Sequence, residues 1–489
     1  MIIKDPTLCE SSILGQYLRT YFDDGWRIMS MFASESSPGA ELNILLRRGK
    51  DIVRITSDVE GSYPAVAPRV PSASVFERAI WEMNGIIPEG HDNLIPAIYW
   101  RKGNGHPLQK GVYITDGEVR APIPKNHVSG PGVFEIPVGP VHAGVIEPGH
   151  FRFSVAGEPI IRLKIHLGYA HKGIEKLMEG PVSYNRSYLA ERISGDNAVA
   201  HGLAHAHTME GDTDIPARAR YIRVILSELE RIHNHLDIIA GLCTDTAFSV
   251  AAALGTEARE ELLRANREIF GSRMLMGNII PGGVKKDIPP ENMPKLENAV
   301  MRAGFATMKV DSYMRRSPSE VDRLETTGVL RAEDAARLGT VGVLARASGI
   351  VSDVRAELPY DAYGDLSFNT IYKKNGDVMS RAAVRVEEVS ESVSLILQCL
   401  KDMEEGEIRT EPEIPDGFSC GMVESPRGEL LHCADIRNGD IWRYSIRDPS
   451  FVNWPALELA VMGNIVPDFP MINKSFGLSY SGMMFEVRT

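Results

Sequence analysis

Apolar residues recur at three- and four-residue intervals through much of the chain after its first third. This spacing places them on one face of a helix and predicts amphipathic helices that pack against one another. The stretches that follow the pattern best are 188–210, 217–245, 256–270, 290–313 and 379–404. Because several of the connections between them are short, the pattern favours a helical bundle.

The first part of the chain follows a different pattern. After a helix-like stretch at 12–22, the runs ELNILLRR and DIVRITS are typical of strands and are separated by Gly, Pro and Ser turns. A further helix is predicted within SVFERAIWEMNG. We therefore expect a small α+β domain over residues 1–120, with the polar, proline-containing stretch 111–129 as a linker.

A second unit is predicted over residues 130–489. It opens with two strand-like runs, 151–155 and 160–165, which predict a β-hairpin that leads into the helices. The predicted fold class is therefore α+β, with a small N-terminal α+β domain followed by a mainly helical domain that has a short β-hairpin at its start.

Composition and charge narrow the class of protein. With 489 residues, 43% of them hydrophobic, the chain is long enough for two or three domains with cores of their own. The formal net charge of −12 argues against nucleic acid as a partner, because nucleic-acid binding needs a basic surface. No apolar run reaches about 18 residues, so no transmembrane helix is expected. The acidic Asp5 and Glu10 near the N-terminus argue against a secretory signal. The five cysteines show no C-x-x-C spacing, which fits a reducing, cytoplasmic compartment.

The most specific signal lies in HKGIEKLMEGPVSYNRSYLAERISGDN, residues 171–197, and in a second stretch at 448–453. These stretches resemble the two metal-binding segments of nickel-iron hydrogenase large subunits, which read R-G-x-E followed by E-R-x-C-G-x-C, and D-P-C-x-x-C. The four cysteine positions of those patterns hold Ser194, Asn197, Ser450 and Asn453 in this chain. A nickel-iron centre is held by four thiolates, and hydroxyl or carboxamide groups are weak ligands for such soft metals. We therefore expect no metal centre at these positions.

Further motifs extend the resemblance over residues 137–476. The hydrogenase pattern I-E-G-H-x-R is matched by 146–152 with one inserted proline, and A-P-R-G-x-x-x-H is matched by 425–432. The phrase ERAIWEMNGI, residues 77–86, resembles the 30 kDa-type subunit of respiratory complex I. The chain is thus identified as a relative of membrane-bound nickel-iron hydrogenases of the hydrogenase-4 and formate hydrogenlyase type, with a 30 kDa-like domain fused to a 49 kDa-like domain.

The resemblance assigns candidate roles to four charged residues. Glu147 stands where a hydrogenase glutamate passes protons, Arg427 stands where an arginine is held over the metal pair, and Asp196 is the third catalytic candidate. The alternatives are that Glu147 caps loop amides and that Arg427 forms a structural ion pair with Asp196 or Glu147. Glu175 matches a magnesium ligand of some hydrogenases, but the histidine that completes that site falls at Ala456.

Complex I keeps the same scaffold without metal, so the resemblance suggests a quinone as a cofactor. The histidine and tyrosine that hold its headgroup correspond to the stretch 146–148 and to about Gly195, and neither donor is kept. His142 and His150 lie close in sequence and, with Arg192, are the candidates for a quinone-like pocket.

Two neighbouring histidines have the spacing of a metal pair. His201 and His205 are four residues apart and would share one helical face. No third ligand at a suitable spacing is evident, so we interpret both as satisfied histidines of the interior or of the surface.

The resemblance leaves two functions open. The first is a subunit of a membrane-associated, complex I-like oxidoreductase that couples electron transfer to ion or proton translocation. The alternative is a non-catalytic subunit that docks partners and transmits conformational change. Both imply an iron-sulfur small subunit similar to the 20 kDa subunit of complex I, which would carry the iron-sulfur cluster, and antiporter-like membrane subunits that hold the chain at the cytoplasmic face of the membrane. We expect Glu147, Arg192, Asp196 and Arg427 to converge on one cavity at the lost metal position.

Overall fold

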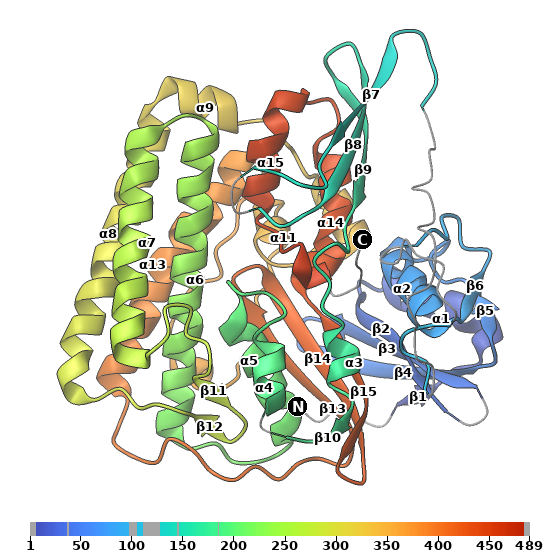
Figure 1. The fold of residues 1–489 in the computed structure, drawn as a ribbon, viewed down its shortest axis with the longest axis horizontal. Helices are drawn as coiled ribbons and strands as arrows, with labels where there is room; N and C mark the ends of the chain where they lie inside the picture. The colour runs from blue at the N-terminus through green and yellow to red at the C-terminus, as the bar shows by residue number, and fades with distance from the viewer. Residues whose placement is uncertain are drawn as a thin grey trace.

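The computed structural model describes residues 6–36, 39–96, 105–110, 128–143, 146–183 and 185–483. Figure 1 shows an N-terminal unit of strands and helices on one side and a bundle of long helices on the other. A central sheet with its own helices lies between them, and a three-stranded sheet projects at one end.

The N-terminal unit is built on a four-stranded sheet in the order β1-β4-β3-β2. Its last three strands form an antiparallel meander, and helix α2 packs against β2. The buried Glu77 of α2 accepts hydrogen bonds from the backbone N–H groups of Val66 and Ala67, which ties the helix to the preceding segment. The elements are β1 (Thr7–Leu8), α1 (Leu14–Asp23), β2 (Arg27–Glu35), β3 (Ala40–Arg48), β4 (Asp51–Val59), β5 (Ser62–Pro64), α2 (Ser74–Asn84) and β6 (Ile87–Glu89).

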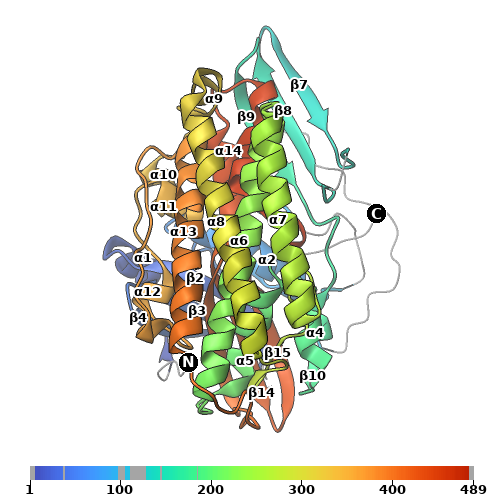
Figure 2. The same cartoon turned by 90° about the vertical axis from the view of Figure 1, so that its left-hand side faces the viewer.

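Four long helices form the bundle and run side by side in Figure 2. Helices α6 and α8 each contact both α7 and α13, so the four surround one apolar core. Their bounds are α6 (Ala217–Asp245), α7 (Ser249–Phe270), α8 (Met293–Arg316) and α13 (Val378–Asp402). The three- and four-residue apolar spacing of the sequence is what turns one face of each helix toward this core.

The central sheet has the strand order β10-β15-β14-β13, and helix α5 (Ala198–Glu210) lies across its last two strands. A side chain at Gly421 of β13 would place its Cβ 2.0 Å from the carbonyl oxygen of Ala204, so glycine is what allows α5 to lie directly on the strand. The strands are β10 (Gly180–Pro181), β13 (Gly417–Ser425), β14 (Gly428–Arg437) and β15 (Asp440–Arg447).

The N-terminal unit packs onto the face of the central sheet. Met29 and Phe32 of β2 and Leu45 of β3 are buried in one cluster with Met422 and Leu431 of β13 and β14. The two sheets therefore share a small apolar core.

The remaining elements connect these layers. The projecting sheet consists of β7 (Val133–Val138), β8 (His150–Ala156) and β9 (Ile160–His166). The other strands and helices are α3 (Ile174–Leu177), α4 (Asn185–Ala190), β11 (Ile279–Ile280), β12 (Gly283–Val284), α9 (Pro318–Leu324), α10 (Ala332–Leu338), α11 (Val343–Ala347), α12 (Val354–Glu357), α14 (Pro449–Ala460) and α15 (Phe469–Phe476). Single turns of 3-10 helix lie at Ser11–Ile13, Pro71–Ala73, Pro290–Asn292, Tyr363–Asp365, Val466–Asp468 and Ser481–Met483.

The α+β fold class is confirmed, and the helix predicted at 217–245 is α6 with the same bounds. The continuous helix predicted at 188–210 is wrong, because the chain leaves the helix between α4 and α5. The carbonyl oxygens of Arg192 and Ile193, which a continuous helix would bond internally, instead accept hydrogen bonds from the Lys172 ammonium at 2.7 and 3.1 Å.

No helix in the parts of the chain that the structure describes combines the length and the apolar character that crossing a bilayer requires.

The predicted linker at 111–129 lies almost entirely outside the described residues, so the domain boundary stays a prediction. We expect limited proteolysis to cut between Gly111 and Gly132, because exposed polar segments are the preferred sites of cleavage. The two fragments should stay associated after the cut, since the shared core between the sheets does not depend on the linker. Mass spectrometry and gel filtration of the digest check both points, and resistance of this stretch while other loops are cut would contradict the boundary.

Candidate functional site

The segments 194–197 and 450–453, which hold the cysteine positions of the two patterns and which we call the lost-ligand segments, lie side by side. Ser194 lies in the loop before α5, and Ser450 lies in the first turn of α14. Ser479, which follows α15, joins them: its hydroxyl lies 2.9 Å from the hydroxyl of Ser194, and its backbone N–H donates to Ser450 Oγ at 3.0 Å. All three serines are buried. Their hydrogen-bonded side chains therefore occupy the space between the two segments.

The two asparagines at lost-ligand positions are used differently. The buried amide of Asn453 clamps the backbone of Val341, accepting from its N–H at 3.0 Å and donating to its carbonyl oxygen at 3.2 Å. Asn197 is the N-cap residue of α5, yet its side chain makes no capping bond, and both its polar atoms are buried without a hydrogen-bond partner among the described residues.

The N-terminus of α5 is capped from another helix. The carboxylate of Glu230 on α6 accepts from the backbone N–H groups of Val199 and Ala200 at 2.7 and 2.9 Å. Burial raises the pKa of Glu230 to about 8, although the two backbone hydrogen bonds favour its ionised form. Because Glu230 takes the helix N–H groups, the amide of Asn197 is left free.

Asp196 and Arg427 form a two-pronged ion pair beside the serines, with the guanidinium nitrogens 3.2 and 2.5 Å from the carboxylate oxygens. Ser194 also donates to Asp196 at 2.9 Å, and Arg427 donates from Nε to the carbonyl oxygen of Gly477 at 2.6 Å. Burial raises the pKa of Asp196, but the Arg427 charge and these hydrogen bonds outweigh it, so the net shift is downward and the carboxylate stays ionised.

Glu147 reaches the same region from the loop before β8. It accepts from the backbone N–H of Ser481 at 3.0 Å, two residues after Ser479. Lys172 lies within electrostatic reach of Glu147 and Asp196. Desolvation of its ammonium and the charge of Arg192 lower the pKa of Lys172 and outweigh the two carboxylates, which raise it, so the net shift is downward. The site therefore places two carboxylates, an arginine and an exposed lysine close to the lost-ligand loop.

Arg192 does not join the Asp196–Arg427 pair. Its side chain is 53% exposed and contacts Glu191 and Met276. Lys172, two residues before α3, is the second cation near the two carboxylates instead. The predicted convergence thus brings together Asp196 and Arg427, with Glu147 close by, and leaves Arg192 at the surface.

The candidate quinone-pocket histidines hold the loop before β8. His142 donates from Nε2 to the carbonyl oxygen of Gly149 at 2.7 Å, and His150 Nδ1 lies 3.4 Å from the carbonyl oxygen of Gly139. His150 Nε2 is buried without a hydrogen-bond partner among the described residues. Both rings therefore fix the backbone that carries Glu147, and their role toward a quinone stays a prediction.

Glu175, the magnesium candidate, is buried at the edge of the central sheet. One carboxylate oxygen lies 2.9 Å from Arg443 Nη2, and the other accepts from the backbone N–H of Ile446 at 2.8 Å. Both oxygens are thus engaged by protein donors. Among the described residues, no group of three or more His, Cys, Asp and Glu side chains is arranged to hold a metal ion.

A buried hydrogen-bonded chain of five side chains begins at Asp448, the N-cap residue of α14. Asp448 Oδ2 lies 3.0 Å from His201 Nε2, and His201 Nδ1 lies 3.0 Å from His432 Nε2. The hydroxyl of Tyr444 lies 2.8 Å from His432 Nδ1 and 2.9 Å from His205 Nδ1. Of the two locations left open, His201 and His205 thus occupy the interior, and they belong to one polar chain.

The order of donors along this chain follows from its acidic end. Burial raises the pKa of Asp448, but the hydrogen bonds from His201 and Ser450 and the charge of Arg427 outweigh it, so the net shift is downward. The carboxylate therefore only accepts, and His201 donates from Nε2. A neutral His201 then accepts at Nδ1 from His432, which accepts in turn from Tyr444, whose oxygen accepts from His205. Every member thus has its donor and its acceptor in one direction. Reversing all four hydrogen bonds requires a proton to enter at His205 and leaves one proton on Asp448.

We expect the free energy of unfolding to fall at acidic pH because His205 is uncharged in the folded chain. Burial lowers the pKa of His205 to about 3, against about 6.5 in an unfolded chain. Its contribution to stability is therefore fully present above pH 6.5 and is lost as the pH falls toward 3. Relative to His205→Gln, the wild-type free energy of unfolding should fall by about 2 kcal/mol between pH 6.5 and 5. Urea unfolding of both proteins at the two pH values measures this, and a difference independent of pH contradicts it.

Comparisons with known proteins place the chain in a family. Residues 21–118 match the 30 kDa subunit of respiratory-chain NADH dehydrogenase, and residues 245–414 and 408–483 match its 49 kDa subunit. Formate hydrogenlyase subunit 5 of Escherichia coli (strain K12) is 32% identical over 454 residues, which cover 88% of this chain and 78% of that protein. The chain belongs to the family of complex I and membrane-bound hydrogenase large subunits.

Further relatives come from both branches of this family. Hydrogenase-4 component G of Escherichia coli (strain K12) is 33% identical over 448 residues, covering 88% of this chain and 77% of that protein. NADH-quinone oxidoreductase subunit 4 of Thermus thermophilus is 31% identical over 372 residues, covering 70% of this chain and 91% of that protein. The hydrogenase and complex I branches are thus both represented among the relatives.

Sequence reasoning within this family missed Lys172 and the polar chain. Lys172 could have been found, because it occupies the arginine position of the R-G-x-E pattern. His432 lies in the A-P-R-G-x-x-x-H match, but nothing in the local sequence connects it to His201 or Tyr444. Only the packing of α5 on the central sheet, which also carries β14 and β15, brings these rings together.

Proposed function

We propose that this chain is a subunit of a membrane-associated, complex I-like oxidoreductase that couples electron transfer to proton or ion translocation and holds no nickel-iron centre of its own. The observation that carries the proposal is the polar chain from His205 to Asp448, which ends at the lost-ligand segment of α14. The family's relatives are named as parts of hydrogenases and of NADH-quinone oxidoreductases, which supports a redox complex.

The donor groups at the lost-ligand positions do not fit a nickel-iron centre. They offer two hydroxyls and two carboxamides where soft, low-valent metals need thiolates. Three of these side chains are already bonded within the protein: Ser194 to Ser479, Ser450 to Ser479, and Asn453 to Val341. No step of the proposed function passes through a metal on this chain.

The site is suited to moving protons. Asp448 lies within electrostatic reach of Arg427, which holds Asp196 on its other side. Neutral imidazoles and a phenol in a continuous hydrogen-bonded chain can each accept one proton and release another. A change of charge near Arg427 can therefore cause protons to move along this chain, toward or away from His205. Glu147, on the opposite loop, is a second group that carries protons.

The surface of the site supports docking of a partner and binding of a small acceptor. Lys172, Arg192 and Gly195 are exposed around the half-buried Asp196. We propose that an iron-sulfur partner protein covers this opening and that a quinone headgroup binds between the two proteins, beside the Asn197 amide and the Asp196–Arg427 pair. Antiporter-like membrane subunits would hold the assembly at the membrane.

Quinone reduction by the complex tests this function. The complex purified with its partners is reduced with dithionite, excess reductant is removed, and a short-chain ubiquinone is added. We expect the iron-sulfur signal to be reoxidised while each quinone takes up two electrons and two protons. A complex whose reduced clusters are not reoxidised by the quinone would contradict the proposed acceptor.

The second candidate is a non-catalytic subunit that couples its partners mechanically. The observation that favours it is that Ser194, Ser450 and Ser479 are hydrogen-bonded to one another where the hydrogenase patterns have metal ligands. For this candidate, substitution of Glu147 leaves translocation unchanged and alters only assembly or stability.

A further inference from the structure

Two of the five cysteines lie directly opposite each other in the central sheet. Strands β13 and β14 pair in an unbroken antiparallel register over 417–425 and 428–436, and this register places Cys420 opposite Cys433. Both side chains are buried, and both are thiols. A pair that meets across two strands has no C-x-x-C spacing, so the local sequence does not reveal it.

The pair occupies a position of the ladder where opposite side chains come closest. Ser425 and Gly428 flank a two-residue turn and so form a hydrogen-bonded pair, and such pairs alternate with non-hydrogen-bonded ones along the strands. Cys420 and Cys433 lie five pairs further along, an odd number, so their pair is non-hydrogen-bonded. The Cα atoms of such a pair lie roughly 4.5 Å apart, within the range of roughly 4.4–6.8 Å that a disulfide spans.

The two thiols are close enough to share a hydrogen bond. Burial, followed by this hydrogen bond and the charge of Cys420, holds the pKa of Cys433 well above its usual range, although Arg54 and Arg447 act in the opposite direction. Cys433 therefore stays a neutral thiol, and a neutral thiol is a poor nucleophile toward an oxidant. Of the two cysteines, Cys420 is the one to consider for a first reaction.

Cys420 can be reached from a cavity of about 490 Å³. Among the described residues that line this cavity, Cys420 is the one cysteine. Lys50 and Pro359 stand in the same lining and are exposed, so the cavity opens to the surface. A molecule as small as hydrogen peroxide can thus meet the sulfur of Cys420 without unfolding of the chain.

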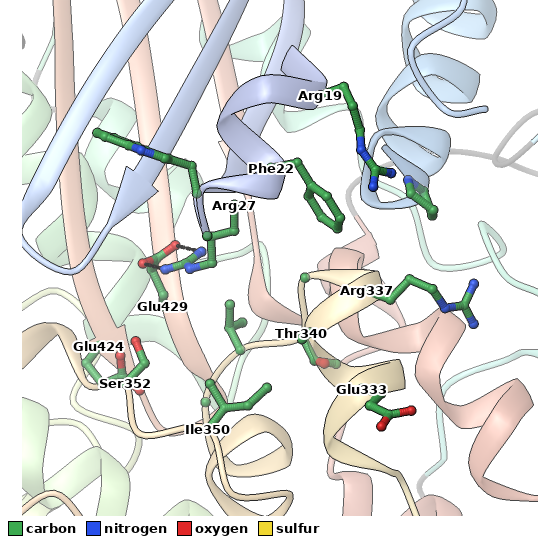
Figure 3. A pocket seen from close by; sticks show the side chains of 17 residues that line it. Arg19, Phe22, Arg27, Glu333, Arg337, Thr340, Ile350, Ser352, Glu424 and Glu429 are labelled. Carbon is green, nitrogen blue, oxygen red and sulfur yellow. Dashed lines mark hydrogen bonds and ion pairs between the residues drawn. The ribbon is translucent and has the colours of Figure 1, made fainter. Parts of the chain in front are cut away.

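The pair lies on the face of the central sheet that meets the N-terminal unit. Glu429, Leu431 and Cys433 alternate along β14 and so share a face. Leu431 and both cysteines are buried in one cluster with Met29 of β2, and Glu429 binds Arg27 of the same strand (Figure 3). Packing on this face holds both strands in place, so the fold presents the two thiols to each other without rearrangement.

From this geometry we propose that Cys420 and Cys433 form a redox site, which hydrogen peroxide oxidises to a cross-strand disulfide. The Cys420 thiolate attacks one peroxide oxygen and the O–O bond breaks, which leaves a sulfenic acid on Cys420. The hydroxide released takes the proton that the thiol had given up and becomes water. The Cys433 sulfur then attacks the Cys420 sulfur, the S–S bond forms, the S–O bond breaks, and the hydroxyl leaves with the Cys433 proton as a second water.

The balance of this reaction is two electrons. Two thiols are oxidised to one disulfide, and one peroxide is reduced to two waters. A low-molecular-weight thiol restores both cysteines by thiol–disulfide exchange. Disulfides in reducing compartments are usually transient or redox-sensing, so this pair is a reversible sensor rather than a structural cross-link.

The disulfide lies on the back of the buried polar chain. His432 immediately precedes Cys433, and its ring bonds His201 of α5 on the other face of the sheet. The hydroxyl of Tyr444 is also within electrostatic reach of both sulfurs. Oxidation therefore acts on the strand that positions His432, which links the state of the pair to the polar chain. The proposal concerns the pair itself and does not depend on the redox role of the chain.

Peroxide treatment of the full chain tests the proposal, with alkylation of the remaining thiols and peptide mapping without reductant. We expect one cross-linked pair of peptides, which joins Cys420 to Cys433 and disappears after dithiothreitol. Cys9, Cys243 and Cys399 are the internal controls, because they are also buried thiols and lie in three different segments. While the chain stays folded by circular dichroism, the pair should be oxidised at least about tenfold faster than these three cysteines.

Two variants make the test sharper. Cys433→Ala removes the second thiol, so Cys420 should be oxidised to sulfenic and sulfinic acid without any cross-link. Cys9→Ala removes a cysteine elsewhere and should form the disulfide as the wild type does. Equal oxidation of all five cysteines in the folded wild type overturns the site. Survival of both thiols, or oxidation of Cys420 to sulfinic acid with no cross-link in the wild type, overturns it as well.

Discussion

Glu429→Ala is expected to lower the free energy of unfolding by about 3–5 kcal/mol, because it leaves buried guanidinium groups without their shared carboxylate. Glu429 is 2% exposed and binds Arg27 and Arg47 from the N-terminal sheet together with Arg447 of β15. Burial opposes ionisation of this carboxyl group, but the three arginines hold the pKa of Glu429 far below its usual range. The residue therefore acts as an ionic link between the two sheets.

A second substitution separates charge from packing at this link. Glu429→Gln keeps the shape of the side chain and removes its charge, so it should lose most of the same stability. Glu405→Ala, on an exposed residue after α13, is the matched control and should change the free energy of unfolding by less than about 0.5 kcal/mol. Urea denaturation of the three variants measures the effect. A Glu429→Gln variant as stable as the wild type would show that the arginines do not depend on this carboxylate.

Glu147→Gln should lower coupled turnover by at least about 100-fold while the complex still assembles, if Glu147 relays protons. Glutamine can still accept the hydrogen bond from the Ser481 N–H, so the loop keeps its geometry. Its amide, however, neither takes up nor releases a proton near neutral pH. Ion translocation by membrane vesicles and the set of subunits present in the purified complex are measured together. Translocation at the wild-type rate would remove Glu147 from the mechanism and favour the scaffold role.

The control for this variant is another acidic residue near the same sheet. Glu158 is exposed in the turn between β8 and β9. Glu158→Gln makes the same chemical change without touching the site, so it should leave both turnover and assembly unchanged. Loss of turnover in both variants would point to an effect of charge on the whole loop region rather than to proton transfer at Glu147.

Local patterns were enough to predict much of the fold. The three- and four-residue apolar spacing indicated the bundle helices, because each one buries a single face. The antiparallel pair β3 and β4 and the hairpin β8–β9 were likewise visible as strand-like runs. The break between α4 and α5 could not be predicted in this way. It depends on hydrogen bonds from the Lys172 ammonium to the carbonyl oxygens of Arg192 and Ile193, and Lys172 lies in a different segment of the chain.

The central sheet escaped prediction for a related reason. Strands β14 and β15 carry Glu429, His432, Arg443 and Arg447, which read as exposed polar residues in a single sequence. All four are buried, because partners from other elements satisfy them. Burial of that kind is a property of the assembled fold and leaves no periodic signal along the chain.

The candidate site was predicted in part. The motif frame placed Asp196, Glu147 and Arg427 in one region but left open which carboxylate Arg427 pairs with, and in the structure it pairs with Asp196. The Ser194 and Ser450 segments are joined through Ser479, which the motifs did not indicate. Arg192 lies at the surface, where its guanidinium contacts Met276 and Glu191. That location depends on the side-chain packing of one loop, which the motif does not encode.

The nickel content of the complex purified with its partners tests the central claim most directly. The account predicts far less than one nickel per chain by elemental analysis, and no hydrogen uptake, because Ser194, Asn197, Ser450 and Asn453 offer no thiolate to hold the metal. About one nickel per chain together with hydrogen uptake would contradict the account.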